Sequence, residues 1–245
     1  MKFTETILGS TYMIFCLKIF RPKREFLGKR IAIIGAADSA FAEKKGSYID
    51  DFDIVIRINK APHSWNAEKS AFIGSKFTYL FHSFYENNFS GGGPIDRNLY
   101  KKLDIKKVVN PNFSRKGLRT HLNFYKRHRA PITTYILPKK NYGKLSRELE
   151  GFIPTVGFSA LSAVLGEKCK EIYITGFTFF KTPYAKGYRA ELADFEANKK
   201  HITAQGLHDP EMEFELFKKE VDRSPCSNIH FDNELSKLLN LEPTA

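Results

Sequence analysis

The sequence predicts a single α/β domain with a mostly parallel central sheet and helices on both faces. Short apolar runs recur along the 245 residues, and stretches long enough for a helix or a crossover separate them. Runs that are apolar at consecutive positions are typical of strands buried on both faces of a parallel sheet. A chain of this length is common for one α/β unit, so no second core is expected.

The apolar runs place seven strands along the chain. In order, these strands cover residues 30–35, 53–59, 76–81, 106–110, 133–137, 171–177 and 228–231. Between the first two strands, Ser39 to Ser47 is expected to form a helix closed by Gly46, which gives a compact βαβ unit. Later helices are expected at 157–166, 209–221 and 233–239.

A glycine-rich loop is expected after the third strand. The segment 84–98 contains three consecutive glycines followed by Pro94, which argues against a helix or strand there. Loops of this kind beside a site often act as lids. We therefore interpret this segment as a mobile loop and not as a domain linker.

The charge balance favours anionic partners. Thirty-nine Lys and Arg residues stand against 27 Asp and Glu residues, which leaves a net charge of +12. The chain has no zinc finger, RNA-recognition signature or basic-aromatic stripe, so nucleic acid is not an expected partner. Cys16, Cys169 and Cys226 lack the spacing of a metal site or a disulfide framework, which favours a reducing, cytoplasmic location.

The first 28 residues form an apolar and basic segment, which we set apart from a main domain at 29–245. An apolar run from Thr6 to Phe20 is interrupted by polar residues and is too short to span a membrane. Two interpretations stay open: an ordinary helix packed on the domain, or a peripheral anchor on the inner face of a membrane. The second is favoured by the cations that follow the run, Lys18, Arg21, Lys23 and Arg24.

A turn of small residues follows the first predicted strand. Gly35 and Ala36 stand at the carboxyl end of that strand, where open α/β sheets bind their ligands, and Asp38 and Ser39 complete the turn. Small side chains let backbone N–H groups approach a phosphate or a ribose. The turn has neither GxGxxG nor GxxxxGK[ST] spacing, so a purely structural β-to-α turn is the alternative.

The second predicted strand ends near the same crevice. Asn59 offers both a donor and an acceptor, which suits a nucleobase or a ribose hydroxyl. For Arg57 we expect a salt bridge with Asp51 or Asp53. These two aspartates have DxD spacing, but they stand at the start of the strand, away from the crevice, so we expect no metal site.

A second ligand-binding turn is predicted at residues 154–157. Thr155, Val156 and Gly157 follow Pro154 and lead into a helix of small residues. The N-terminus of that helix directs backbone N–H groups outward, which is favourable for an anion. We expect the two turns to face each other across one ligand.

Two long segments resemble the sialyl motifs of family 29 sialyltransferases. IAIIGAADSAFAEKKGSYIDDFDIVIRINKAP, residues 31–62, resembles the large motif. IPTVGFSALSAVLGEKCKEIYITGF, residues 153–177, resembles the small motif, and the two occur in the family's order. IGSKFTYLFHS, residues 73–83, resembles the segment that follows the large motif. The tract from YITGFTFF through PYAKGY to a downstream histidine is also similar to bacterial family 42 sialyltransferases.

The resemblance implies a Rossmann-like, GT-A-like fold and an inverting glycosyltransferase that uses a CMP-activated ulosonic acid without a metal ion or another cofactor. Asn59 falls where the family has a donor-contacting Asn, and Thr155 and Gly157 fall on the turn that holds CMP. The family's second donor-contacting Asn is replaced by Ala36. Asp38 or Ser39 would then have to substitute for it.

The resemblance also concerns a disulfide. The family links a Cys of the large motif to a Cys of the small motif. In this chain Cys169 occupies the second position, but Ile31 stands at the first. The bridge therefore cannot form.

The catalytic residues implied by the resemblance are His208 and Glu213. They are separated by four residues, like the His and Glu of the family's C-terminal motif, whose His is the catalytic base. An imidazole with a pKa near ~6.5 can accept a proton from a hydroxyl at neutral pH. Without the motifs, His208 would be interpreted as part of a helix cap with Asp209.

The residues that meet the leaving phosphate are expected between the small motif and His208. Tyr184 and Tyr188, with Lys186 between them, stand where these families place phosphate-contacting side chains. Aromatic packing is the alternative role for both tyrosines. His201 is a weaker candidate for the same contact.

The sequence therefore predicts a cytoplasmic transferase that moves sialic acid (Neu5Ac) from CMP-sialic acid to a hydroxyl of a glycan or glycolipid, as in lipopolysaccharide or capsule synthesis. Two alternatives stay open. One is a transferase of the same fold that uses CMP-Kdo. The other is a nucleotide-binding module without transferase activity.

Overall fold

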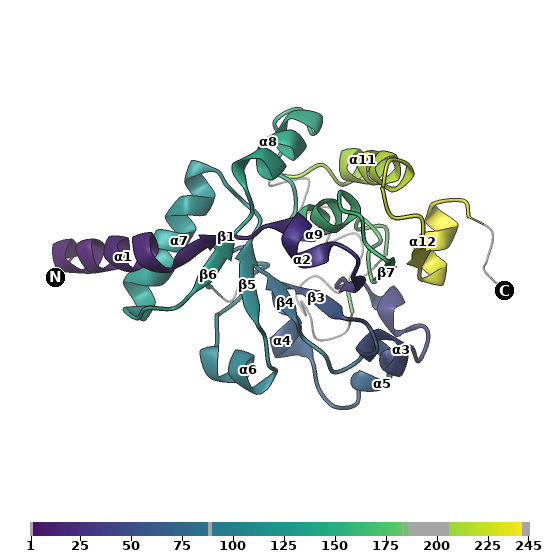
Figure 1. The fold of residues 1–245 in the computed structure, drawn as a ribbon, viewed down its shortest axis with the longest axis horizontal. Coiled ribbons are helices and arrows are strands. Elements are labelled where there is room, and N and C mark those ends of the chain that lie inside the picture. The colour runs from purple at the N-terminus through teal and green to yellow at the C-terminus, as the bar shows by residue number, and fades with distance from the viewer. Residues whose placement is uncertain (1, 88–89, 183, 186–205, 242–245) are drawn as a thin grey trace.

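The computed structural model describes residues 2–87, 90–182, 184–185 and 206–241. In this part of the chain, eight parallel strands form one sheet in the order β1-β6-β5-β4-β3-β2-β7-β8 (Figure 1). The prediction of an α/β fold with a parallel sheet is confirmed. The strands are β1 Leu17–Ile19, β2 Arg30–Ile34, β3 Ile54–Ile58, β4 Tyr79–Phe81, β5 Lys107–Asn110, β6 Thr134–Ile136, β7 Glu171–Thr175 and β8 Ile229–Phe231.

Helices connect the strands and cover the sheet. The three helices predicted nearest the C-terminus are confirmed to within two residues as α9, α11 and α12. The described helices are α1 Lys2–Cys16, α2 Pro22–Phe26, the 3₁₀ turn η1 Asp38–Phe41, α3 Gly46–Asp50, α4 Ala61–Ser64, α5 Ser70–Ile73, α6 Arg97–Lys102, α7 Arg115–His128, α8 Lys139–Glu148, α9 Val156–Leu165, α11 Pro210–Asp222 and α12 Asn233–Leu238.

Both faces of the sheet are buried. Alternate residues of a strand point to opposite faces, and in β2 Ile31 and Ile33 join one apolar cluster while Ala32 and Ile34 join another. The first cluster includes Phe158 of α9 and Phe217 of α11, which pack on that face. Burial on both sides explains why the four residues of β2 after Arg30 are all apolar.

The helix expected at 39–47 is wrong. The chain instead forms the 3₁₀ turn η1, then a break, then the short helix α3. Gly46 begins α3 and does not close the earlier helix. A Cβ atom at Gly46 would lie 1.9 Å from the carbonyl oxygen of Ser70, so glycine is required here for close packing against α5.

The sheet extends into the segment 1–28. Strand β1 pairs in parallel with β6, in the register Leu17 to Thr134 and Ile19 to Ile136. The side chains of Phe20 and Phe26 are buried in the main core. This strand is absent from the sequence prediction because it has only three residues and a lysine at its centre.

The strand order creates a crevice at one place in the sheet. From β2 the chain adds β3, β4 and β5 on one side, and later places β7 and β8 on the other side. The chain runs from β2 toward β3 and from β7 toward β8, which lie in opposite directions along the sheet. Between two such neighbouring strands a crevice opens at the carboxyl ends, where open α/β sheets bind ligands. The two predicted glycine turns lie at this edge of the sheet.

No helix in the described ranges is both long and apolar enough to cross a lipid bilayer.

Candidate functional site

A cavity of about 480 Å³ lies at the carboxyl ends of strands β2, β3, β4, β5 and β7. The structure brings most of the predicted site residues to its wall. These are Gly35, Ala36, Asn59, Thr155, Val156, Gly157, Tyr184, His208 and Glu213. Tyr188, Lys186 and His201 lie outside the described residues.

The turn after β2 is in close contact with the turn after β7. The backbone N–H of Gly35 donates to Thr175, and that of Ala37 donates to Gly176 at 3.0 Å. A Cβ atom at Gly35 would lie 2.0 Å from the carbonyl oxygen of Gly176. Gly176 itself has φ +73°, a left-handed conformation that favours glycine. Glycine at both positions therefore lets the two turns meet and form the floor of the crevice.

The structure does not bring Asp38 and Ser39 to the cavity. Asp38 accepts a hydrogen bond from Thr182 at 3.0 Å, and Ser39 donates to Asp232 at 3.1 Å. Neither residue belongs to the cavity wall. The idea that one of them takes the place of the Asn absent at Ala36 is not supported by this geometry.

Asp232 is a structural residue of the site that the sequence did not indicate. Its carboxylate also accepts from the backbone N–H of Gly176 at 2.7 Å and from the hydroxyl of Thr175 at 2.9 Å. With the bond from Ser39, it fixes the turn after β7 against the turn after β2. Nothing local in the sequence reveals this role, because Asp232 and Ser39 are 193 residues apart.

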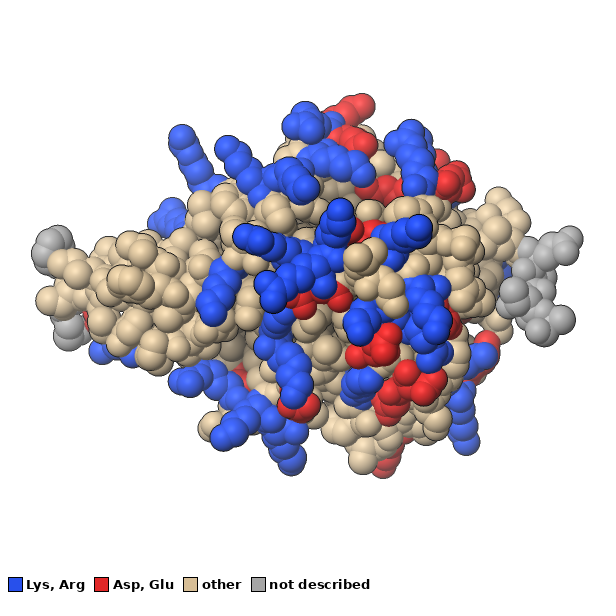
Figure 2. Space-filling view, viewed as in Figure 1, with Lys and Arg blue, Asp and Glu red and all other residues tan. Residues whose placement is uncertain are grey.

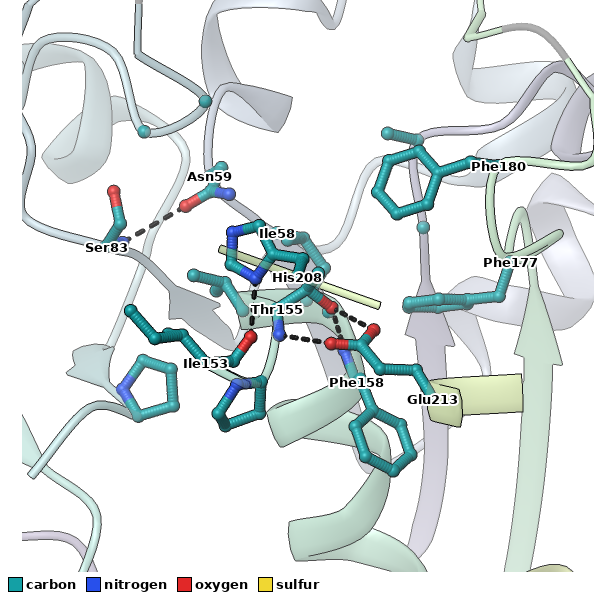
Figure 3. Close-up of a pocket in the computed structure, with 18 of the residues that line it drawn as sticks. Ile58, Asn59, Ser83, Ile153, Thr155, Phe158, Phe177, Phe180, His208 and Glu213 are labelled. Atoms are coloured by element: carbon teal, nitrogen blue, oxygen red, sulfur yellow. Dashed lines mark hydrogen bonds between the residues drawn. The ribbon is translucent and has the colours of Figure 1, made fainter. Parts of the chain in front are cut away.

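Asn59 projects from the end of β3 into the cavity (Figure 3). Its φ of +49° is left-handed, a conformation that Asn adopts more readily than most residues. The side-chain oxygen accepts from the backbone N–H of Ser83 at 3.1 Å, which orients the amide. Among the described residues, the Nδ2 group has no acceptor within hydrogen-bonding distance. It is thus a donor that a ligand can use.

Thr155 caps helix α9 and is held by Glu213. Its Oγ1 accepts from the backbone N–H of Phe158 at 3.1 Å, and this bond satisfies one free donor of the helix N-terminus. The carboxylate of Glu213 accepts from the backbone N–H and from the hydroxyl of Thr155 (Figure 3). Glu213 is only 1% exposed, and burial raises its pKa to about 8 although both bonds from Thr155 lower it.

His208 lines the cavity, with its ring beside the carbonyl group of Ile153 (Figure 3). Its Nδ1 is 2.5 Å from the carbonyl oxygen of Ile153. A carbonyl only accepts hydrogen bonds, so Nδ1 carries the proton and Nε2 keeps its lone pair. Burial lowers the pKa of His208, and the nearby charge of Lys116 lowers it further. The imidazole is therefore neutral at neutral pH and has one basic nitrogen.

Tyr184 lines the cavity on the side of the β2 turn. It forms an isolated antiparallel bridge with Ala37, and the backbone N–H of Ala185 donates to Ala36 at 2.9 Å. The Tyr184 ring packs edge-on against Phe180, with ring centroids 6.0 Å apart. The aromatic packing expected as its alternative role is therefore observed, and Tyr184 also lies beside the turn after β2.

The other half of the cavity was not predicted residue by residue. It lies at the ends of β4 and β5, and its wall includes Ser83, Tyr85, Asn110, Asn112 and Lys116. Only a general rule could have indicated these residues from the sequence: polar residues that follow parallel strands gather at one edge of the sheet.

The glycine-rich loop borders the cavity. Gly91 and Gly92 line it, and the buried His82 anchors the loop by donating from Nε2 to the carbonyl of Gly92 at 2.8 Å. The Nδ1 of His82 accepts from the backbone N–H of Phe84, also at 2.8 Å. Burial lowers the pKa of His82 to about 4, so this neutral arrangement persists at neutral pH.

The expected salt bridge of Arg57 is wrong. Its guanidinium is buried and donates to three backbone carbonyls, those of Ile73, Gly74 and Lys76. The side chain of Arg57 thus points along the sheet face toward α5 and not toward either aspartate.

The DxD spacing of Asp51 and Asp53 has a structural explanation. Asp51 pairs with the guanidinium of Arg30 at 2.6 Å, and Asp53 accepts from the backbone N–H of Arg30 at 2.9 Å. Both aspartates precede β3, at the end of the strand opposite Asn59. In the described residues, no group of three or more His, Cys, Asp or Glu side chains is arranged to hold a metal ion.

The cysteines are unpaired. Cys169 is buried, and Ile31 occupies a core position in β2. Burial raises the pKa of the Cys169 thiol. The disulfide of the resembled family is absent, as the sequence predicted.

The fold is similar to that of known sialyltransferases. A crystal structure of a mammalian sialyltransferase matches with a TM-score of 0.55 and 18% sequence identity, over 92% of this chain and 78% of the other. The crystal structure of a mammalian sialyltransferase in complex with Gal-β-1,3-GalNAc-ortho-nitrophenol matches with a TM-score of 0.53, also at 18% identity, over 91% and 77%. No protein-family model and no curated protein sequence matches the chain. The likeness supports a sialyltransferase-like fold.

Proposed function

We propose that the protein is an inverting, metal-independent glycosyltransferase that moves sialic acid from CMP-sialic acid to a hydroxyl of a glycan or glycolipid. One observation carries the proposal: a neutral His208, fixed by Ile153, directs a basic nitrogen into the cavity. This base lies beside two turns suited to a phosphate, in a fold similar to that of sialyltransferases.

In the proposed reaction, the acceptor oxygen attacks the anomeric carbon of the sugar from the face opposite CMP. The new C–O bond forms as the bond between the anomeric carbon and the phosphate oxygen breaks, so the configuration inverts. The acceptor proton passes to Nε2 of His208, and CMP leaves with the electron pair of the broken bond. Because His208 starts neutral, it is ready to accept this proton.

The nucleotide is proposed to lie at the turns after β2 and β7. Gly35 and Gly157 give backbone N–H groups close access to it, and the Nδ2 of Asn59 offers a further donor. The N-terminus of α9, capped by Thr155, favours negative charge. Tyr184 and Tyr188 are the proposed partners of the phosphate, where negative charge accumulates as CMP leaves.

Glu213 is proposed to position the site and not to transfer protons. Both of its oxygens are bound to Thr155, so the carboxyl holds the turn that faces the donor. A cytoplasmic location is part of the proposal.

Two alternatives can be tested alongside. Ala36 stands where the resembled family has a donor-contacting Asn, which favours a different CMP-sugar such as CMP-Kdo. A nucleotide-binding module without transferase activity would bind CMP but leave both CMP-sugars intact.

The test is donor turnover. We expect release of CMP from CMP-Neu5Ac by the wild-type protein, and a loss of about 10²-fold to 10⁴-fold in His208→Ala. His230→Ala is the matched control, because His230 is exposed on β8 and does not line the cavity. It should keep full activity.

The outcomes separate the candidates. If the protein turns over CMP-Kdo but not CMP-Neu5Ac, the proposed donor is wrong and the proposed mechanism still holds. CMP binding without turnover of either donor would support the binding module. A fully active His208→Ala variant would remove His208 as the base, and absence of both binding and turnover would end the transferase proposal.

A further inference from the structure

Helix α1 presents an apolar face to solvent. Nine large hydrophobic side chains are exposed in the described residues, and six of them belong to the first 27 residues. Ile14 and Phe15 are 75% and 77% exposed, more than any of the others. The remaining four are Ile7, Leu8, Ile19 and Leu27.

Four of these side chains, those of Ile7, Leu8, Ile14 and Phe15, lie on one continuous stripe of α1. With 3.6 residues per turn, the helix places its exposed positions within an arc about 120° wide. The residues of this arc are Thr4, Ile7, Leu8, Thr11, Ile14 and Phe15, and none of them is charged. A helix on the surface of a soluble domain normally directs polar residues outward, so α1 has the opposite pattern.

The other face of α1 is packed against the domain. Tyr12, Met13 and Cys16 pack against the cluster that contains Phe124 of α7. Gly9 approaches the α7 backbone so closely that a Cβ atom there would lie 3.1 Å from the backbone nitrogen of Lys126. The domain therefore packs on this other face of α1 and leaves the exposed stripe uncovered.

Basic residues follow the stripe directly. Lys18, Arg21, Lys23 and Arg24 are exposed, and none has a described carboxylate within 4.0 Å. Figure 2 shows α1 as an almost entirely uncharged projection at one end of a body rich in Lys and Arg. The chain as a whole carries a net charge of +12.

We propose that α1 and the basic residues after it form a docking surface for an anionic lipid membrane. The apolar stripe would enter the boundary between headgroups and acyl chains, while the cations contact lipid phosphates. A second copy of the chain is a poorer occupant. Its own +12 charge and its own basic cluster would oppose the contact, whereas an anionic bilayer complements both features.

Helix α7 contacts both α1 and the cavity. Helix α7 packs on α1 near Lys126 and contributes Lys116 to the cavity wall ten residues earlier, a rise of about 15 Å. If the transferase function proposed above holds, a docked α1 keeps the cavity within reach of glycolipid headgroups. The docking itself does not depend on that function.

The test is binding of the full chain to vesicles in a flotation assay. We expect binding to vesicles that contain phosphatidylglycerol, and weak binding to pure phosphatidylcholine. Ile14→Ser/Phe15→Ser should weaken binding about tenfold or more, because two exposed side chains no longer enter the bilayer. Leu241→Ser, which removes an exposed apolar side chain at the other end of the chain, should bind like the wild type.

Charge is tested with a matched pair of variants. Lys23→Glu/Arg24→Glu should weaken binding about tenfold or more, and Lys101→Glu/Lys102→Glu on α6, with the same change in net charge, should have a much smaller effect. Far-UV circular dichroism and thermal unfolding should be unchanged in all of these variants, which shows that they fold.

Equal vesicle binding by the wild type and the Ile14/Phe15 variant would overturn the proposal. So would a dimer of the wild-type protein, lost in that variant, without vesicle binding. In that case the stripe is an interface between copies.

Discussion

The carboxyl group of Glu213 and the turn residue Thr155 form a two-point contact, with 2.6 Å to the backbone nitrogen and 2.7 Å to Oγ1. The contact joins the start of α11 to the start of α9. Burial raises the pKa of Glu213 to about 8, so most molecules carry a proton on this carboxyl at neutral pH. When protonated, it accepts with one oxygen and donates with the other, as a glutamine amide does.

We therefore expect Glu213→Gln to fold and to retain activity within a few-fold of the wild type. Glu213→Ala should lose about 3 kcal/mol of unfolding free energy, because it leaves a cavity and two unpaired polar groups of Thr155. Urea unfolding and donor turnover check both variants. If Glu213→Gln is as inactive as His208→Ala, then Glu213 takes part in proton transfer and is not only a positioning residue.

The raised pKa of Glu213 should also make the stability of the protein depend on pH. The pKa of Glu213 is raised from 4.5 to about 8 on folding, so between these values the folded state binds more protons than the unfolded state. The unfolding free energy of the wild type should then fall as pH rises through this window, by at most about 1.4 kcal/mol per pH unit, and level off above pH 8. Subtraction of the Glu213→Gln curve isolates this group, and a difference that does not change with pH contradicts the assignment.

The sequence predicted the sheet and the two turns at its carboxyl edge because these are local features. Apolar runs identify buried parallel strands, and the residues that follow β2 and β3 must share one edge of the sheet. The contacts that shape the site are not local. Thr155 and Glu213 are 58 residues apart, and no spacing rule indicates which buried carboxyl will meet which turn.

Arg57 shows a second limit of prediction from the sequence. Nearby aspartates made a salt bridge the natural expectation, because opposite charges close in sequence attract. The strand instead buries Arg57, and Asp51 turns to Arg30 across the start of β3. Which face of a strand a side chain occupies decides its partners, and that depends on packing that a single sequence does not reveal.

A buried arginine bound to three carbonyls should not tolerate lysine. Arg57→Lys keeps the charge but loses the planar fork that reaches Ile73, Gly74 and Lys76, so we expect a loss of about 2 to 3 kcal/mol of unfolding free energy. Lys29→Arg, an exposed exchange of the same two residue types beside β2, should change stability by less than about 0.5 kcal/mol. Thermal unfolding of the two variants provides the comparison, and equal stability would contradict this account of Arg57.

His208 predicts the shape of the pH–rate profile. The base must be neutral to accept a proton, and burial holds its pKa below 6.5. Turnover should therefore rise with pH on a limb whose midpoint lies below pH 6.5. Lys116→Gln removes a charge that lowers this pKa, so its limb should move to higher pH, while Lys102→Gln on α6 should leave it in place. An acid limb that persists unchanged in the residual activity of His208→Ala would assign it to another group.

Glycine at position 35 is required by the contact between the turns after β2 and β7. The missing Cβ would lie 2.0 Å from the carbonyl oxygen and 2.6 Å from the carbonyl carbon of Gly176, and these backbone atoms cannot move aside as the end of a flexible side chain could. Gly35→Ala should therefore cost several kcal/mol or prevent folding. Gly143→Ala is the matched control, because nothing lies within 4 Å of its Cβ position in α8, and removal of a helical glycine should raise the unfolding free energy by about 0.5 to 1 kcal/mol. Chemical unfolding curves measure both changes. A Gly35→Ala protein as stable as the wild type would mean that the two turns are further apart than the structure places them, and that the crevice proposed for the nucleotide has a different floor.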